Sequence, residues 1–127
     1  ALKEAKKAKI RTSLRLDPLI PDITDNRDNI CDVIEKCAKY IDQVIVSTFK
    51  PRFDSMKRIT NAYPQLKEKY NSIYRERKGN SLYLPLDLRL NLIELARNEA
   101  IKHNLKFSSC REGFSYLNTA TCDGSGI

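Results

Sequence analysis

Three short segments of this sequence combine charged, hydroxyl or thiol side chains with a proline or a glycine. They read Arg15-Leu16-Asp17-Pro18-Leu19-Ile20-Pro21, Ser47-Thr48-Phe49-Lys50-Pro51 and Ser108-Ser109-Cys110-Arg111-Glu112-Gly113. Each lies at the carboxyl end of a stretch that we predict to be a β-strand. Ligands bind at the carboxyl ends of the strands in open parallel sheets and in β/α barrels. We therefore expect a functional site where these segments meet, the alternative being that they are ordinary polar turns.

Arg15 is the first candidate for a contact with a ligand. Its guanidinium stays charged and presents its donors as a fork that matches a carboxylate. If the side chain points into the interior of a barrel, it could bind such an anion there. The alternative is a surface arginine that pairs with Asp17 or Asp25.

Hydroxyl side chains accompany this arginine near two of the strand ends. Ser13, Ser47 and Thr48 could donate hydrogen bonds to ribose hydroxyls or to a substrate. Hydroxyls in such positions are common, however, and often only cap the helix that follows. Both interpretations stay open for these residues.

The cysteines are candidate metal ligands. No secretory signal opens the sequence, and cysteines in such a chain are more often thiols or ligands than disulfides. Cys110 and Cys122 lie on either side of a polar loop and could ligate an auxiliary iron–sulfur cluster or zinc, but a four-thiolate site needs two further ligands. Cys31 and Cys37 lie about 120° apart around a predicted helix, so they cannot reach one ion. Reactive thiols, or a site completed by upstream residues, are the alternatives for Cys110 and Cys122.

The strands that position these residues follow from hydrophobic periodicity. Residues 10–17 alternate between apolar and polar side chains, which is typical of a half-buried strand. We expect Pro18 and Pro21 to end it, because proline lacks the backbone donor of a ladder. Residues 43–49 contain a β-branched run typical of a buried parallel strand, and residues 105–110 are predicted to form a third strand.

A helix is predicted between the first two strands. Thr24 or Asp25 is its expected N-cap. Its apolar stripe consists of Ile30, Val33, Ile34, Cys37, Ala38 and Ile41. This spacing places every member on one face, which should pack against the sheet.

Three further helices are predicted before the last strand. Residues 51–61 and 64–78 form two of them, the second ended by Gly79. The third, over residues 86–103, ends at Asn104 in a left-handed conformation. Its inward side chains should be Leu88, Leu92, Leu95, Ala96 and Ala100.

This order of elements predicts an α/β fold. Strands that alternate with helices pair in parallel through right-handed crossovers. Three such strands cannot close, so we expect an open sheet with flanking helices that forms part of a β/α barrel and lacks its other half. The length suits a single domain over residues 1–127, with residues 111–127 as a loop-rich tail. An unclosed sheet edge also favours self-association.

Composition and charge indicate the expected location of the protein and the class of partner it could bind. No apolar run approaches the ~20 residues of a membrane span, so we expect a cytoplasmic protein that does not enter a membrane. A net charge of +7 favours acidic partners such as nucleic acid, although dispersed lysines and arginines are also typical of solvated helix faces. The tyrosines at positions 63, 70, 74 and 83 could stack on bases, but their spacing favours packing in a core.

The first segment also carries a resemblance to a known family. Arg15 to Pro21, followed by Ile23 and Asp25, resembles the "RxDPxIPGxND" stretch of radical S-adenosylmethionine enzymes of the spore-photoproduct-lyase-like and DNA-repair-photolyase-like group. In that family this stretch lies at the fourth strand of a partial barrel. The next strand, the helical insertion and the closing Cys110-Arg111-Glu112-Gly113 also fit, so the resemblance covers nearly the whole chain.

Two departures from the family pattern matter. Asp22 and Thr24 replace the usual glycine and asparagine, which predicts a different backbone geometry after Pro21. The Cys-x3-Cys-x2-Cys loop of the family, which holds a 4Fe–4S cluster with one iron open to S-adenosylmethionine, has no counterpart in this sequence. The resemblance therefore implies the C-terminal half of such an enzyme, with the front half supplied upstream in the same or a separate chain.

The resemblance also implies roles for individual residues. S-adenosylmethionine and a 4Fe–4S cluster would be the cofactors of the complete enzyme, and Arg15 would bind the methionyl carboxylate. Further contacts would come from Ser13, Ser47, Thr48 and Arg111. The complete site would cleave S-adenosylmethionine reductively, and the resulting radical would abstract hydrogen from a substrate. This segment alone would be inactive.

Two alternatives to the radical enzyme stay open. The chain could be a non-enzymatic basic α/β module that binds nucleic acid or a protein partner. It could also be a stable fragment with no function in isolation. Binding that weakens steeply with salt would favour the nucleic-acid module.

Overall fold

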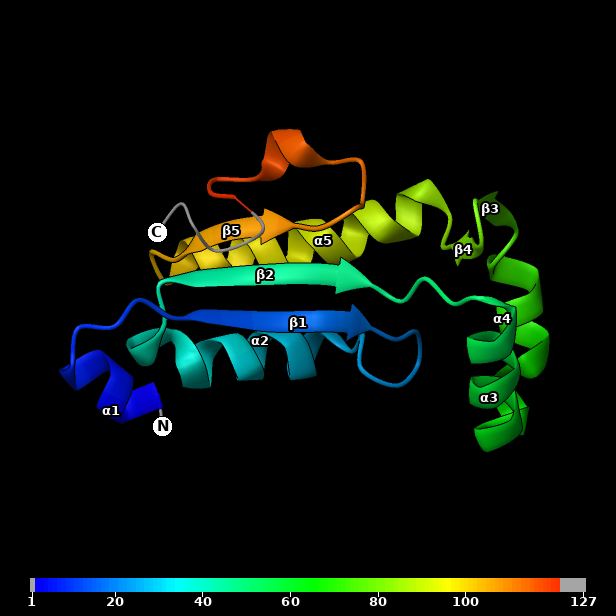
Figure 1. The fold of residues 1–127 in the computed structure, drawn as a ribbon, viewed down its shortest axis with the longest axis horizontal. Coiled ribbons are helices and arrows are strands. Elements are labelled where there is room, and N and C mark those ends of the chain that lie inside the picture. The colour runs from blue at the N-terminus through cyan, green and yellow to red at the C-terminus, as the bar shows by residue number, and fades with distance from the viewer. Residues whose placement is uncertain (1, 122–127) are drawn as a thin grey trace.

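A three-stranded parallel sheet forms the centre of the molecule (Figure 1). The computed structural model describes residues 2–121. Strands β1 (Ser13–Leu19), β2 (Gln43–Thr48) and β5 (Lys106–Ser109) lie side by side in the order β1-β2-β5. The predicted α/β fold, with an open parallel sheet and flanking helices, is therefore confirmed.

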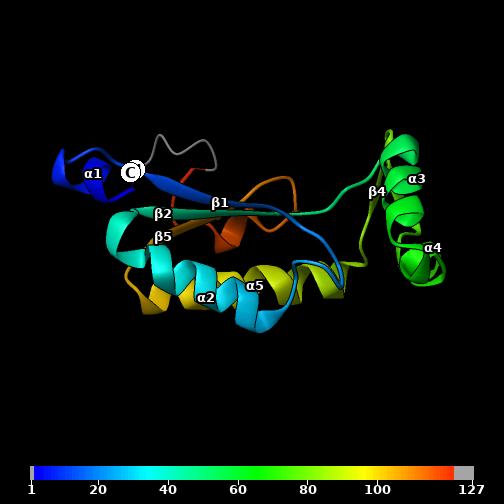
Figure 2. The same cartoon turned by 90° about the horizontal axis from the view of Figure 1, so that it is seen from below.

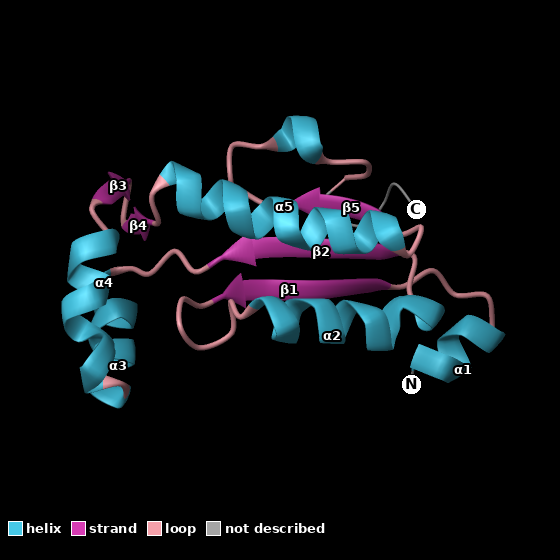
Figure 3. Ribbon diagram, turned by 180° about the vertical axis from the view of Figure 1, so that it is seen from behind, coloured by secondary structure: helices cyan, strands magenta, loops and turns pink. Residues whose placement is uncertain are grey.

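Two helices cover one face of this sheet. Figures 2 and 3 show α2 (Arg27–Cys37) and α5 (Leu86–Lys102) side by side on that face. A short helix, α1 (Leu2–Lys7), lies near the amino end of β1. Single 3-10 turns lead into β2 (η1, Ala38–Tyr40) and follow β5 (η3, Ser115–Leu117). Within residues 2–121, no helix covers the opposite face of the sheet.

The main core lies between the sheet and the two covering helices. Val44 and Val46 of β2 are fully buried, and Phe107 of β5 is buried with them. Ile34 of α2 and Ile93 of α5 belong to the same cluster. Full burial of a side chain of this size contributes about 1.5–3 kcal/mol. These contacts therefore fix the helices on the sheet and keep the strand ends in register.

Residues 52–83 form an outlying unit beyond the carboxyl ends of the strands (Figure 2). It consists of α3 (Phe53–Ala62), η2 (Pro64–Leu66), α4 (Lys67–Ile73), β3 (Glu76–Lys78) and β4 (Ser81–Tyr83). The last two strands pair as an antiparallel hairpin. The outlying unit is thus an insertion between β2 and α5.

A second, smaller core attaches this outlying unit to the sheet. It is built on Tyr70, Tyr74 and Leu84, which are almost completely buried. The Tyr70 hydroxyl donates to the carbonyl of Pro21 at 2.5 Å, and the Tyr74 hydroxyl donates to the carbonyl of Phe49 at 3.0 Å. The predicted packing of these two tyrosines is therefore confirmed, and they tie the unit to the segments after β1 and β2.

The start of the fold corrects two sequence predictions. The first strand does not end at Pro18 but continues to Leu19, because the ladder is irregular between Leu16 and Leu19 and needs no donor from the proline. The N-cap of α2 is Asn26, not Thr24 or Asp25. Its side-chain oxygen accepts hydrogen bonds from the amides of Asp28 and Asn29 at 2.8 and 3.3 Å.

Two predicted helices also need correction. The helix expected over residues 64–78 stops at Ile73, and Gly79 takes its positive φ in the turn of the β3–β4 hairpin instead of at a helix end. In α5, Leu88 was expected to point inward but is 40% exposed. Arg89 takes the inward position and is 1% exposed. The left-handed conformation predicted for Asn104 is confirmed.

Candidate functional site

The three chemically rich segments meet at the carboxyl edge of the sheet. The parallel register pairs Leu16 with Val46 and Val46 with Ser109, so the residues that follow each strand emerge at the same edge. Lys50 after β2 and Glu112 after β5 make an ion pair there. We call this group of strand ends the carboxyl edge.

Glu112 is the centre of a buried network at the carboxyl edge. The residue is only 2% exposed. Its carboxylate accepts hydrogen bonds from the backbone amide of Thr48 at 2.7 Å and from the Thr48 hydroxyl at 2.9 Å, and it pairs with the ammonium of Lys50. A buried carboxylate is stable only with such partners. Glu112 therefore clamps the segment after β5 to the end of β2.

Arg89 of α5 closes this network from the helix side. Its Nη1 donates to the carbonyl of Glu112 at 2.7 Å and lies 3.9 Å from the Glu112 carboxylate. Its Nε donates to the carbonyl of Leu84 at 2.9 Å, and Nη2 lies 3.7 Å from the carboxylate of Glu76. One arginine thus joins the sheet, α5 and the hairpin of the outlying unit.

Sequence reasoning missed Arg89 because the inward stripe of α5 was assigned to leucines. A signal was present: Arg89 stands four residues before Ile93, and Ile93, Ala96 and Ala100 are the buried residues that follow it along the helix. That spacing puts Arg89 on the same buried face. A charged residue on a buried face requires partners, and the network around Glu112 supplies them.

The electrostatics of the carboxyl edge couple all three strand ends. Burial lowers the pKa of Lys50 below its usual value, and Glu112 opposes that shift through its hydrogen bond and its charge. Arg111 lowers this pKa further, whereas Asp17 raises it. The aromatic ring of Tyr83 adds a cation–π contact, with the Lys50 ammonium 5.7 Å from the ring centroid.

Arg15 lies on the face of β1 away from the helices. Leu14 and Leu16 pack against the main core, so the side chain between them points to the opposite face. The Arg15 guanidinium is half exposed and lies 3.5 Å from the Asp17 carboxylate. This is the surface pair that the sequence left open, and it still leaves the guanidinium accessible to an anion.

The predicted hydroxyl contacts have partners within the protein. Ser47 is buried and accepts a hydrogen bond from the Lys50 ammonium at 3.0 Å. The hydroxyl of Thr48 is engaged by Glu112, so neither residue caps a helix. Ser13 is half-buried at the start of β1, and Arg111 is exposed with a positive φ. The structure therefore groups Ser47 and Thr48 with the buried network and leaves Arg15 and Arg111 at the surface.

The proposed metal ligands lie apart or outside the described residues. Cys110 is half-buried at the carboxyl edge, whereas Cys122 falls outside residues 2–121. In that part of the chain, no group of three Cys, His, Asp or Glu side chains could hold a metal ion. Cys37 packs against the main core, and burial raises the pKa of the Cys31 thiol. A 4Fe–4S cluster would thus need ligands from elsewhere.

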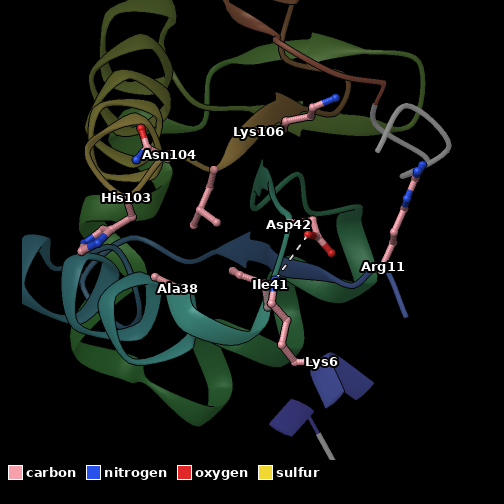
Figure 4. Close-up of a pocket in the computed structure, with 9 residues that line it drawn as sticks. Lys6, Arg11, Ala38, Ile41, Asp42, His103, Asn104 and Lys106 are labelled. Atoms are coloured by element: carbon pink, nitrogen blue, oxygen red, sulfur yellow. Dashed lines mark ion pairs between the residues drawn. The ribbon is translucent and has the colours of Figure 1, made fainter. Parts of the chain in front are cut away.

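A separate cavity of about 470 Å³ lies at the opposite, amino end of the sheet (Figure 4). Its lining mixes Lys6, Arg11, Asp42, His103 and Lys106. Asp42 accepts a hydrogen bond from the amide of Thr12 at 2.9 Å and lies 3.9 Å from the Lys6 ammonium. None of the predicted site residues lines this cavity, so it is separate from the carboxyl edge.

Comparison with known proteins leaves the family open. Compared with protein-family models, curated proteins and solved structures, the chain matches none of them. Among the helices of residues 2–121, none combines the length and the apolar character needed to cross a membrane. The family resemblance therefore stays a prediction from the sequence.

Proposed function

We propose that this chain is the C-terminal half of a radical S-adenosylmethionine enzyme and contributes the wall of the site that binds the anionic end of S-adenosylmethionine. The observation that carries the proposal is the accessible guanidinium of Arg15, which lies within β1 on the helix-free face of an open parallel sheet. A guanidinium in that position matches a carboxylate in charge and shape. Arg111, exposed after β5, is the second candidate contact.

The two edges of the sheet support a partner on the side of β1. The free side of β5 is occupied by the chain itself, because the amide of Phe107 donates to the Thr119 hydroxyl at 2.8 Å and the amide of Thr119 donates back to Phe107 at 2.7 Å. Within residues 2–121, no strand pairs with the outer side of β1. We propose that an upstream strand pairs there, and a second copy of this chain is the alternative occupant.

In the proposed enzyme, the cofactors supply the chemistry and the residues of this chain supply binding and positioning. The complete enzyme would use a cluster and S-adenosylmethionine for one-electron chemistry, but the described residues do not provide a cluster site. The share of this chain is to bind an anion through Arg15 and to keep the strand ends rigid through Glu112 and Arg89. We place the protein in the cytoplasm, where thiols stay reduced.

The test is S-adenosylmethionine binding by calorimetry, with protein expressed anaerobically from its complete reading frame. Loss of a charge-assisted hydrogen bond of about 1.5–3 kcal/mol predicts that Arg15→Ala weakens binding about 10- to 150-fold. Arg58→Ala is the matched control, because Arg58 also pairs with an aspartate at the surface but lies in the outlying unit. Equal affinity of Arg15→Ala and the unaltered protein would remove the role of Arg15.

We propose a second candidate function, binding of nucleic acid by the outlying unit. Residues 52–83 contain eight of the 23 Lys and Arg residues but only three of the 16 Asp and Glu residues, so they carry +5 of the net charge of +7. Charge concentrated in this way attracts phosphates and makes binding fall with salt. A titration with single-stranded DNA at rising salt tests it, and undetectable or salt-insensitive binding would exclude it.

A further inference from the structure

A small pocket in the outlying unit has the composition of a site for a flat aromatic ligand. It lies between α3, α4 and the β3–β4 hairpin and has a volume of about 230 Å³. Its lining consists of Phe53, Met56, Asn71, Arg77, Asn80 and Leu82. This volume is below the ~300–1,000 Å³ of typical small-molecule pockets, so it suits a single ring system.

Phe53 supplies the aromatic surface of this pocket. The residue is 85% exposed, so the protein itself does not cover its ring. An exposed aromatic ring in a basic environment is the feature on which unpaired bases stack, at about 1–3 kcal/mol per base. Met56 and Leu82 provide apolar walls on either side of the ring site.

Polar side chains at the same pocket match the edge of a base. The amides of Asn71 and Asn80 each offer donors and an acceptor, which are the groups that recognise base edges. The Nε of Arg77 donates to the carbonyl of Gly79 at 3.0 Å, which holds the guanidinium at the pocket. The amide of Leu82 donates to the carbonyl of Pro51 at 2.8 Å and so fixes the hairpin against the segment before α3.

The charge around the pocket favours a phosphate-bearing ligand. Arg52 precedes Phe53, and Arg75 and Lys78 stand on either side of Arg77 in the sequence; all of these basic side chains are exposed. Lys78 is paired with Glu76 at 3.5 Å and lies 4.9 Å from the ring centroid of Tyr83, and a surface pair of this kind contributes little to stability. A base in the pocket would therefore have its phosphates in a positive field.

We propose that the Phe53 pocket binds one unpaired base of a single-stranded nucleic acid, with the flanking phosphates held by the basic side chains of the outlying unit. This inference rests on the second proposed function, because it names the form of nucleic acid that the outlying unit binds. A duplex keeps its bases stacked and cannot place one in the pocket without unpairing it. The proposal accordingly predicts preference for a single strand over a duplex of the same length.

The test measures fluorescence anisotropy with a labelled single-stranded DNA, the same sequence as RNA, and the corresponding DNA duplex. Phe53→Ala is expected to weaken single-strand binding about 5- to 150-fold without changing its dependence on salt, because no charge is removed. Arg77→Gln should instead reduce the salt slope by about one. Tyr116→Ala is the matched control, since Tyr116 is 72% exposed but lies outside the unit. The DNA and RNA arms decide which sugar is preferred.

The outcomes separate the two proposals. Phe53→Ala could leave salt-dependent binding of the single strand unchanged. That result would overturn the proposed role of the pocket and would support binding by the basic surface of the outlying unit alone. Equal losses in Phe53→Ala and Tyr116→Ala would overturn it as well. Absence of binding to all three probes would overturn both the pocket and the proposed nucleic-acid function. Because Phe53 is exposed, its variant should fold normally, and circular dichroism checks this before each titration.

Discussion

Charge is distributed differently in the outlying unit and in the sheet body, by which we mean the chain outside residues 52–83. In the sheet body the acidic and basic residues nearly balance, and the decisive charges of Lys50, Arg89 and Glu112 are buried and paired with one another. In residues 52–83 the charge is concentrated, and the ion pair of Arg58 with Asp54 is exposed. Buried and paired charges fix the geometry of the sheet body. We propose that the exposed charges of the outlying unit bind a ligand instead.

The largest expected effect is loss of the Glu112 carboxylate. Glu112→Ala leaves Lys50 and Arg89 buried without their common partner, which predicts a destabilisation of about 3–5 kcal/mol. Urea unfolding followed by circular dichroism measures it. Glu94→Ala, an exposed position of α5, is the control and should change little. Equal stability of the two variants would mean that the sheet body is not held by its buried charges.

Replacing both charges of the Lys50–Glu112 ion pair should lower the free energy of unfolding less than removing one of them. Lys50→Met alone leaves Glu112 buried with one partner fewer, whereas Lys50→Met combined with Glu112→Leu removes both charges. Apolar replacement of a buried pair is often close to neutral. We expect the double variant to be more stable than either single variant, with a coupling of about 0.5–3 kcal/mol in a double-mutant cycle. Additive losses would contradict a direct interaction.

Loss of the Tyr70 hydroxyl should have a moderate effect on stability, and the size of that effect should depend on pH. Tyr70→Phe removes the hydrogen bond to Pro21 and should cost about 0.5–1.5 kcal/mol near neutral pH. Burial raises the pKa of Tyr70 to about 12 from an ordinary value of 10.0. The folded state thus holds the proton of the Tyr70 hydroxyl more tightly than the unfolded state does. The stabilisation that this hydroxyl gives the folded state is therefore complete below pH 10 and is lost as the pH rises towards 12.

Unfolding curves across that alkaline range test this point. The unaltered protein should lose its advantage over Tyr70→Phe as the pH rises from 10 towards 12. Asp22 and Asp25 add to the shift through their charges, although burial is its main cause. A stability difference that does not change over this range would mean that the Tyr70 hydroxyl is solvated.

The smallest expected effect on stability belongs to Phe53. Its ring is 85% exposed, so Phe53→Ala should shift the free energy of unfolding by no more than about 0.5 kcal/mol. The same variant should weaken nucleic-acid binding strongly. A large loss of stability would show instead that Phe53 packs in the core of the outlying unit, which would contradict its proposed place in a ligand site.

Much of this fold could be predicted because periodicity records burial directly. The alternation before Pro18 and the apolar run of β2 identified two parallel strands, and the carboxyl ends of the three chemically rich segments do lie at one edge. The extension of β1 past Pro18 could not be predicted, because it depends on an irregular ladder with β2. The β3–β4 hairpin was missed because residues 76–78 are charged and exposed, with no apolar pattern.

The network at the carboxyl edge was the hardest part to predict. Glu112 and Arg89 are 23 positions apart, and their contact exists only after α5 packs on the sheet. Sequence patterns treat an isolated arginine in a helix as a surface residue, because charged side chains are rarely buried. Arg15, by contrast, was recognised as a charged residue in a segment expected at a strand end, although it lies within β1 opposite Ile45. Its exposed pair with Asp17 was one of the two expected arrangements.

One measurement tests the central proposal most directly. The gene is read upstream of the codon for Ala1, the complete frame is expressed without oxygen, and iron–sulfur content is measured by electron paramagnetic resonance. The account predicts an in-frame Cys-x3-Cys-x2-Cys motif and a reducible 4Fe–4S cluster whose signal changes when S-adenosylmethionine is added. A complete frame without that motif, or a protein that binds no cluster, would contradict the assignment of this chain to a radical enzyme.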